Sequence, residues 1–201
     1  MNHERPATGR RPLNLAFVLD PLPELKASKD SSIAMMRAAA TCSHAVFAID
    51  CATLAWRWPE SAQPGGVSGV AVQLHMQPDD HDWFREIGRD RIPLTNFDAI
   101  IMRRDPPFDN EYLTATWLLE RAEADGVRVF NRPRALRDHS EKVAIAEFPQ
   151  FAPETLICRD VEQLQQFIDE YGDVILKPLD GMGGSQIFRV QRADPNRNVI
   201  I

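Results

Sequence analysis

The chain has 201 residues, of which 44% are hydrophobic and 26% are charged, and its formal net charge is -6. This composition is typical of a folded protein with one sizeable core or two small ones, and it argues against a disordered chain. The acidic balance argues against nonspecific nucleic-acid binding, which depends on basic patches. Because no apolar segment approaches the length needed to cross a bilayer, we expect neither nucleic acid nor membrane among the partners.

Three cysteines, Cys42, Cys51 and Cys158, form no C-x-x-C pair and leave an odd number for disulfide pairing. Such a set is typical of reduced thiols, and we therefore expect a cytoplasmic protein. The arginines before the apolar run 13–19 resemble the start of a signal peptide. That run is short, ends at Asp20 and lacks a small-x-small cleavage site, so it is better interpreted as a first buried strand.

From Leu13 onward, short apolar runs alternate with segments of helical period, which is the pattern of a parallel sheet covered by helices. Strands are expected at four runs: 13–19, 45–49, 97–102 and 127–130. A first helix is expected where Ser31 or Ser32 can act as the cap. A second is expected at 110–125, and Gly126 is expected to end it.

The helix expected at 110–125 has an apolar stripe, which at this spacing indicates a core face more often than a cofactor site. The stripe consists of Leu113, Trp117, Leu118 and Ala122. The stretch 56–69 contains prolines and a Gly-Gly pair, so a loop or a hairpin tip is expected there.

The sequence is expected to divide into a disordered extension at 1–12, a first domain at 13–132 and a second unit at 133–201. The boundary is placed where Pro133 and several arginines interrupt the periodic pattern. The second unit is expected to contain a short helix from Ser140, a strand at 154–158 and then a helix. Asp160 is expected to cap that helix, with Gln163 reaching back.

The run from Val174 to Ser185 reads VILKPLDGMGGS and is the most informative part of the second unit. A buried strand is expected at 174–176, a glycine-rich turn follows, and a second strand is expected at 185–190. A Walker loop and a dinucleotide fingerprint both open a helix, so a strand–turn–strand order argues against both. An ordinary hairpin with a glycine turn remains the alternative to a phosphate-binding loop.

The segment KPLDGMGG with IFRV after it resembles the phosphate loop of bacterial glutathione synthetases, which are ATP-grasp enzymes. Further stretches agree in order and spacing: VLDP at 18–21 with KDSS at 29–32, MRRDPPFD at 102–109, and NRP, LRD and SEK between 131 and 142. The resemblance extends from about Leu13 to the last residue. It implies an α/β fold, in which a Rossmann-like pre-ATP-grasp domain with a parallel sheet precedes a truncated α+β ATP-grasp subdomain.

By this resemblance, two lysines and the glycine loop bind ATP. The implied residues are Lys142, Lys177, Gly181, Gly183, Gly184 and Ser185. Lys177 is plausible on physical grounds alone, because a lysine that ends a buried strand and precedes a proline must direct its ammonium group to solvent or to an anion. Lys142 is assigned by the resemblance only. The glycines leave backbone N–H groups open to phosphate oxygens.

Arg103 lies at the carboxyl end of a predicted parallel strand, where open α/β sheets bind their ligands, and a guanidinium matches a substrate carboxylate. Asp20 and Ser31 are expected at the same edge as further substrate-binding residues, although helix capping explains Ser31 equally well. Asp109 could also serve as a helix cap after a rigid Pro-Pro turn. Arg104 replaces a lysine of the family, which leaves its contact with substrate open.

The resemblance implies ATP with Mg²⁺ or Mn²⁺, but the metal ligands of the family lie beyond residue 201. No residue here is therefore assigned as a metal ligand or as a catalytic group, and we expect the isolated chain to be an inactive fragment. His75, His81 and His139 lack the spacing of a metal site.

The activity implied for the intact enzyme is ATP-dependent ligation of γ-L-glutamyl-L-cysteine to glycine through an acyl phosphate, with glutathione, ADP and phosphate as products. The implied assembly is a homotetramer. Two alternatives stay open: another ATP-grasp carboxylate–amine ligase, and a non-catalytic binding or assembly module. A nicotinamide dehydrogenase is disfavoured because no G-x-G-x-x-G follows the first strand.

Overall fold

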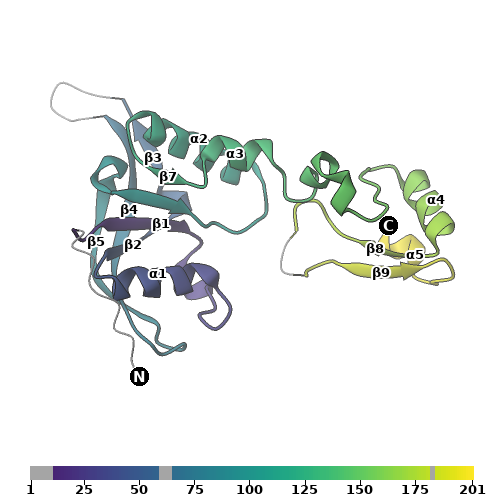
Figure 1. Cartoon of the computed structure of the whole chain (residues 1–201), viewed down its shortest axis with the longest axis horizontal. Coiled ribbons are helices and arrows are strands. Elements are labelled where there is room, and N and C mark those ends of the chain that lie inside the picture. Colours follow the sequence, from purple (N-terminus) through teal and green to yellow (C-terminus); the bar gives the residue numbers. More distant parts are fainter. Residues whose placement is uncertain (1–10, 59–64, 182–183) are drawn as a thin grey trace. The chain divides into compact units, whose positions relative to one another are not determined.

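A computed structural model describes residues 11–58, 65–181 and 184–201. Two compact units emerge: one comprises the chain up to 105 together with 110–136, and the other comprises 106–109 with 137–201 (Figure 1). Of the extension predicted at 1–12, residues 1–10 lie outside the described part. Arg11 forms an ion pair with Asp98.

Unit 1 is built around a mixed sheet of seven described strands. They are β1 (Asn14–Leu19), β2 (Ala45–Asp50), β3 (Ala55–Arg57), β4 (Gly66–Met76), β5 (Phe84–Pro93), β6 (Ala99–Met102) and β7 (Val129–Phe130). The order is β3-β4-β2-β1-β6-β7, and β5 pairs with β4. Strands β2, β1, β6 and β7 are parallel, whereas β4 is antiparallel to its three neighbours. The predicted parallel α/β sheet is therefore confirmed, with an antiparallel extension at one side.

The antiparallel extension contains what the sequence analysis missed. A loop or a hairpin tip was predicted at 56–69, but both ends of this stretch are strand, because Trp56 of β3 pairs with Val67 of β4. The strand β4 was therefore not predicted. The part at 59–64 lies outside the described residues. Strand β5 was not predicted, because most of its side chains are exposed and polar and it shows no apolar alternation. Its backbone bonds to β4 form the strand instead.

Helix α1 comprises Ser31–Thr41, and its N-cap is Asp30 rather than either serine. The Asp30 Oδ1 atom accepts hydrogen bonds from the backbone N–H of Ser32 at 2.6 Å and of Ile33 at 3.4 Å. The prediction of Ser31 or Ser32 as the cap is thus wrong, since the preceding carboxylate already satisfies these donors. Both serine hydroxyls lie in the first turn and are left for other contacts.

Helix α2 (Asn110–Ala124) ends as predicted at Gly126, which has a φ of +95°. Its predicted core stripe is partly wrong: Trp117 is 55% exposed, while Leu113 and Leu118 are half-buried. The buried face consists of Tyr112, Ala115, Thr116, Leu119 and Ala122. Small residues in the middle of this face allow the helix to approach the sheet, and Trp117 is too large for that place.

Alternate residues of β1 face two separate cores. Ala16 and Val18 belong to the core that includes α2, whereas Phe17 and Leu19 belong to the core that includes Ile33 of α1. The two helices therefore cover opposite faces of the sheet (Figure 1). Burial on both faces explains why β1 reads as one continuous apolar run.

Unit 2 contains an antiparallel hairpin of β8 (Asp173–Leu176) and β9 (Phe188–Gln191) with flanking helices. The helices are α4 (Val161–Tyr171) and α5 (Arg197–Ile200), and α3 (Pro133–Asp138) lies across the division between the units. Ile168, Val174 and Val190 form the core of the hairpin and α4. The strand–turn–strand order is as predicted, but the second strand begins at 188 rather than 185, because 184–186 form a turn.

Further predictions for unit 2 had mixed outcomes. Asp160 caps α4 as predicted, and Gln163 Nε2 donates to its side chain at 3.1 Å. The strand predicted at 154–158 is wrong, because this stretch has no strand partner in the described part of the unit. The helix predicted from Ser140 is a turn followed by a 3₁₀ segment at Ala144–Glu147.

Candidate functional site

The sheet of unit 1 reverses its strand order at β1. From β1 the chain continues through α1 to β2 on one side, and it returns to β6 on the other side. In open α/β sheets a ligand crevice forms outside the carboxyl ends of the strands at such a reversal. Asp20 follows β1, Arg103 follows β6, and Ser31 begins α1. The predicted substrate-binding residues therefore come from three segments that meet at this edge.

Arg103 is held against α1 by both serines of its first turn. Its Nε donates to Ser32 Oγ at 3.0 Å, and its Nη2 donates to Ser31 Oγ at 2.8 Å. Within the described ranges, no carboxylate lies at ion-pair distance from this guanidinium. The half-buried Arg103 thus makes no ion pair within these ranges, although its charge acts on the nearby carboxyl group of Asp105.

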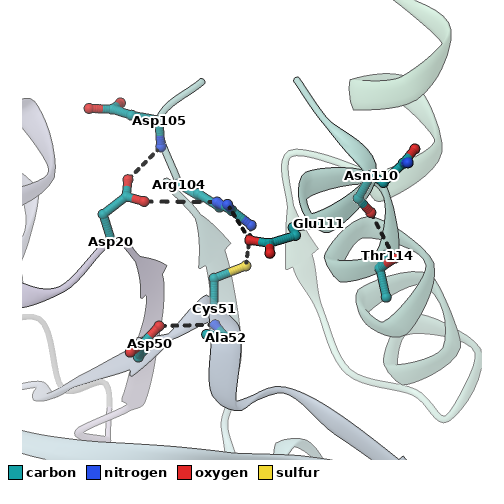
Figure 2. Close-up of polar contacts among 9 residues, drawn as sticks. All are labelled: Asp20, Asp50, Cys51, Ala52, Arg104, Asp105, Asn110, Glu111 and Thr114. Atoms are coloured by element: carbon teal, nitrogen blue, oxygen red, sulfur yellow. Dashed lines mark hydrogen bonds and ion pairs between the residues drawn. The ribbon is translucent and has the colours of Figure 1, made fainter. Parts of the chain in front are cut away.

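Asp20 is engaged within the fold itself. Its Oδ2 atom accepts a hydrogen bond from the backbone N–H of Asp105 at 2.8 Å, and its Oδ1 atom lies 3.8 Å from Arg104 Nε (Figure 2). These contacts join the chain after β1 to the chain after β6. Asp20 therefore joins the two segments that form the edge where Arg103 lies.

Arg104 is directed into the protein, with only 13% of its side chain exposed. Its Nη2 lies 3.3 Å from a carboxylate oxygen of Glu111 in α2, and its Nη1 lies 3.7 Å from Cys51 Sγ (Figure 2). Burial raises the pKa of the Cys51 thiol, and the nearby Arg104 opposes that rise. Arg104 thus links the segment after β1, the segment after β2, and α2, whereas its neighbour Arg103 contacts α1.

The carboxyl group of Asp105 completes the charge pattern at this edge. Partial burial raises its pKa, and the negative charges of Asp20 and Asp30 add to the rise. Arg103 opposes it. The edge therefore holds several carboxylates whose mutual repulsion an incoming cation or a proton would relieve.

In unit 2, a cavity of about 680 Å³ lies between the hairpin, α4 and the segment around 141–157. Five of the six residues predicted to bind ATP line it: Lys142, Lys177, Gly181, Gly184 and Ser185. The sixth, Gly183, lies outside the described residues. Much of the remaining wall is apolar, including Ile145, Leu156, Ile157, Leu164, Phe167 and Leu176.

The two lysines that line this cavity differ in their exposure and in their hydrogen-bond partners. Lys142 has 20% of its side chain exposed, and its Nζ lies 2.5 Å from Glu141 Oε1. Lys177 is exposed and makes no hydrogen bond or ion pair with any described residue. The cavity wall therefore carries one cation with a neighbouring carboxylate and one cation that is open to an anion.

The loop between β8 and β9 has two positions that depend on glycine. A Cβ atom at Gly181 would lie 2.7 Å from Pro178 Cγ, which is closer than side chains tolerate. Gly184 has a φ of +82°, a left-handed conformation that other residues adopt with strain. This backbone leaves room on the cavity side for a ligand to approach closely.

Sequence reasoning missed several residues of these sites. Asp30 is the cap and Ser32 is buried behind Arg103, and the run Asp-Ser-Ser before an apolar segment carried a signal for both. Cys51 and Glu111 gave no signal, because only the fold brings them to Arg104. In the described residues, no group of three His, Cys, Asp or Glu side chains has a metal-binding arrangement.

Two family models match nearly the whole chain. The prokaryotic glutathione synthetase N-terminal domain matches residues 13–137, and the prokaryotic glutathione synthetase ATP-grasp domain matches residues 141–201. No helix in the described residues is long and apolar enough to cross a membrane.

Relatives with curated names agree with these models. A glutathione synthetase of Nitrosomonas europaea is 48% identical over 189 residues, which are 94% of this chain and 58% of the relative. The glutathione synthetase of Ralstonia nicotianae is 48% identical over 94% of this chain and 56% of its own length. That of Vibrio cholerae is 41% identical over 94% of this chain and 58% of its own length. The chain thus spans less than two thirds of these relatives. A solved structure of the ATP-grasp ligase PsnB, complexed with a minimal precursor, is 18% identical to this chain and has a TM-score of 0.46. The match covers 89% of this chain and 57% of that one, and the likeness is too distant to support an argument.

Proposed function

Since the chain belongs to the prokaryotic glutathione synthetase family, we propose that it forms part of an enzyme that joins γ-L-glutamyl-L-cysteine to glycine at the expense of ATP. In this reaction the dipeptide carboxylate attacks the γ-phosphorus of ATP, and ADP leaves. The glycine amine then attacks the acyl phosphate, phosphate leaves, and glutathione is released. Each step conserves charge and atoms, with one proton released from the amine.

The observation that carries this proposal is the cavity of unit 2. Its volume of about 680 Å³ is suitable for a nucleotide, and its wall combines apolar side chains with two lysines and a glycine loop. An adenine ring is flat and apolar on its faces, whereas the phosphates need cations and N–H donors. The lining supplies both kinds of surface within one unit.

In this proposal Lys142 and Lys177 neutralise phosphate charge, which is the main electrostatic task in phosphoryl transfer. The loop with Gly181, Gly183 and Gly184, followed by Ser185, covers the β- and γ-phosphates through backbone N–H groups. The open state of Lys177 supports its role. Lys142 would exchange its contact with Glu141 for a contact with phosphate oxygens.

The dipeptide substrate is assigned to the carboxyl edge of the sheet in unit 1. Arg103 supplies the guanidinium for one of its carboxylates, because it is the arginine at this edge that has no carboxylate partner among the described residues. Asp20 and Ser31 support this site from the neighbouring segments. Arg104 contributes through the fold rather than by contact with the substrate.

The proposal includes Mg²⁺ or Mn²⁺ with the nucleotide, because phosphoryl transfer needs a divalent ion to balance charge. The described residues hold no cluster suited to such an ion. The chain spans 58% of the length of a curated relative, and we assign the metal ligands to the part of the enzyme that this stretch does not cover. We therefore expect the isolated chain to be inactive. A homotetramer of the intact enzyme and a cytoplasmic location belong to the same proposal, and three free cysteines agree with a reducing compartment.

The test is ADP release in the presence of γ-glutamylcysteine, glycine, ATP and Mg²⁺. It should be run on this chain and on the uninterrupted polypeptide of its reading frame. We expect turnover only from the longer protein, and only when both substrates are present. Activity of this chain alone would contradict the assignment of the metal site.

Two other outcomes of the same assay would redirect the proposal. Turnover with amines other than glycine would indicate another ATP-grasp carboxylate–amine ligase. Dipeptide binding without ADP release from either protein would indicate a binding or assembly module.

A further inference from the structure

We infer that Ser31 and Ser32 are positioning residues that hold one edge of the Arg103 guanidinium and leave the adjacent edge, formed by Nη1 and Nη2, open to a carboxylate. The inference rests on the proposed dipeptide site, and it assigns to Ser31 and Ser32 a role other than direct contact with the substrate. It also predicts from which side the carboxylate arrives.

The argument starts from the shape of a guanidinium group. Its five N–H donors lie in one plane and divide into a side edge, formed by Nε and Nη2, and an end edge, formed by Nη1 and Nη2. Ser32 Oγ accepts from Nε at 3.0 Å and Ser31 Oγ accepts from Nη2 at 2.8 Å. Both serines therefore occupy the side edge.

The end edge is left without an acceptor in the described part of the chain. The Nη1 group and the second N–H of Nη2 point along it, and two parallel donors of this kind match the two oxygens of a carboxylate. A carboxylate should thus approach in the guanidinium plane, along the adjacent edge that the serines leave free. A lysine at this position would offer no such edge, because its ammonium is a point charge.

The serines are themselves held in place by the start of α1. Ser32 is 2% exposed, and its backbone N–H donates to Asp30 Oδ1 at 2.6 Å. Both hydroxyls project from the same first helical turn, so the cap that begins α1 also fixes the distance between the two acceptors. This arrangement reduces the conformational freedom that a long arginine side chain loses on binding.

The neutrality of the serines is as important as their position. A carboxylate in their place would pair with the guanidinium and cancel its charge, as Asp20 and Glu111 do for Arg104. Hydroxyl acceptors orient Arg103 and leave its charge available. Orientation without neutralisation is what a binding site for an anionic substrate requires.

The first experiment tests the grip without any substrate. The Nε–H resonance of Arg103 is observed by ¹⁵N NMR in this chain, in the Ser31→Ala/Ser32→Ala variant, and in Thr41→Ala as a matched control from the last turn of α1. Thr41 Oγ1 bonds only to the backbone of Arg37 among the described residues. We expect slow hydrogen exchange in the wild-type chain and in Thr41→Ala, and at least tenfold faster exchange in the serine variant. Equal exchange rates in all three would overturn the inference.

The second experiment measures whether the serines act through Arg103. Affinity for γ-glutamylcysteine is measured by calorimetry in a double-mutant cycle of Ser31→Ala/Ser32→Ala with Arg103→Ala. We expect the serine substitutions to weaken binding about three- to tenfold in the wild-type background, and to have no effect once Arg103 is alanine. An equal loss in both backgrounds would overturn the positioning role, because it would show that the serines act independently.

The two proposals can fail separately. If neither the wild-type chain nor any variant binds the dipeptide, the assigned substrate is wrong. Acetate, a minimal carboxylate, then serves as the probe of the open edge. Acetate should shift the Arg103 Nε resonance of the wild-type chain, and the serine variant should need a several-fold higher concentration for the same shift. Failure of acetate to shift the wild-type resonance would overturn the inference about the open edge.

Discussion

The carboxyl edge of the sheet in unit 1 and the cavity of unit 2 present charge to a ligand in two different ways. At the sheet edge, side chains from three segments are bonded to one another, and Arg103 is oriented by two hydroxyls. In the cavity, Lys177 has no partner among the described residues, and the loop beside it relies on glycine backbone.

The difference reflects what each site would bind. A carboxylate is a planar group with two oxygens, and selection of it benefits from a rigid donor pair. A triphosphate chain is long and carries several charges, and it benefits from mobile cations and from many backbone donors. We therefore expect unit 1 to tolerate substitutions in its framework poorly, and unit 2 to depend on single charges.

The largest expected effect is on the nucleotide. Lys177→Ala should weaken binding of ATP or a fluorescent ATP analogue roughly ten- to hundredfold, because a hydrogen bond to a charged group contributes about 1.5–3 kcal/mol. Lys26→Ala removes the same charge from an exposed residue of unit 1 and should leave the affinity unchanged. Equal losses from both variants would mean that net charge, rather than the cavity, decides binding.

The adjacent arginines offer the next contrast. Arg104→Met should lower the free energy of unfolding of unit 1 by about 1–3 kcal/mol, because it leaves Asp20 without its cation and removes a contact with α2. Arg103→Met should lower it by less, about 0.5–1 kcal/mol, since it removes hydrogen bonds to neutral hydroxyls and no ion pair. Urea unfolding followed by tryptophan fluorescence measures both.

The same pair should behave in the opposite way in dipeptide binding. Arg103→Met should weaken the affinity for γ-glutamylcysteine roughly ten- to hundredfold, a loss that calorimetry can still measure, whereas folded Arg104→Met should retain most of it. A result in which Arg104→Met loses binding without loss of stability would show that Arg104 contacts the substrate.

The helix caps provide a matched test in the two units. Asp30 and Asp160 each accept two backbone bonds, at 2.6 and 3.4 Å in α1 and at 2.8 and 3.4 Å in α4. Replacing either with alanine should lower the free energy of unfolding by about 1 kcal/mol. Only Asp30→Ala should also weaken dipeptide binding, because only α1 carries the serines that hold Arg103. Calorimetry on both variants checks this difference.

The smallest expected effect is on the dependence of stability on pH. The pKa of Asp105 is raised, mainly by partial burial, so the folded protein holds this proton more tightly than the unfolded chain. The stability contributed by this group is therefore present below the ordinary carboxyl pKa, and it decreases as pH rises through the raised value. Asp105→Asn should reduce this decrease, which urea unfolding between pH 4 and 7 measures. An unchanged pH profile would contradict the raised pKa of Asp105.

Hydrophobic periodicity and helix-ending residues such as glycine predicted the parts of the fold that depend on local sequence. The parallel strands were recognised because burial on both faces produces short apolar runs, and α2 was recognised by its helical period and by Gly126. Strand β5 was missed because its pairing with β4, and not its side chains, defines it. The face of α2 was misjudged because Trp117 is apolar but too large for the close approach that Ala115 permits.

The sequence by itself determined the family of this protein, through motifs whose order and spacing are read directly along the chain. It also determined which residue types were available for phosphate and carboxylate. Only the tertiary structure decided the roles of two neighbouring arginines. Arg103 and Arg104 have the same side chain and follow the same strand. One meets hydroxyls from α1, and the other meets carboxylates from the segment after β1 and from α2. The partner that a charge meets depends on contacts between distant segments, and no local pattern records them.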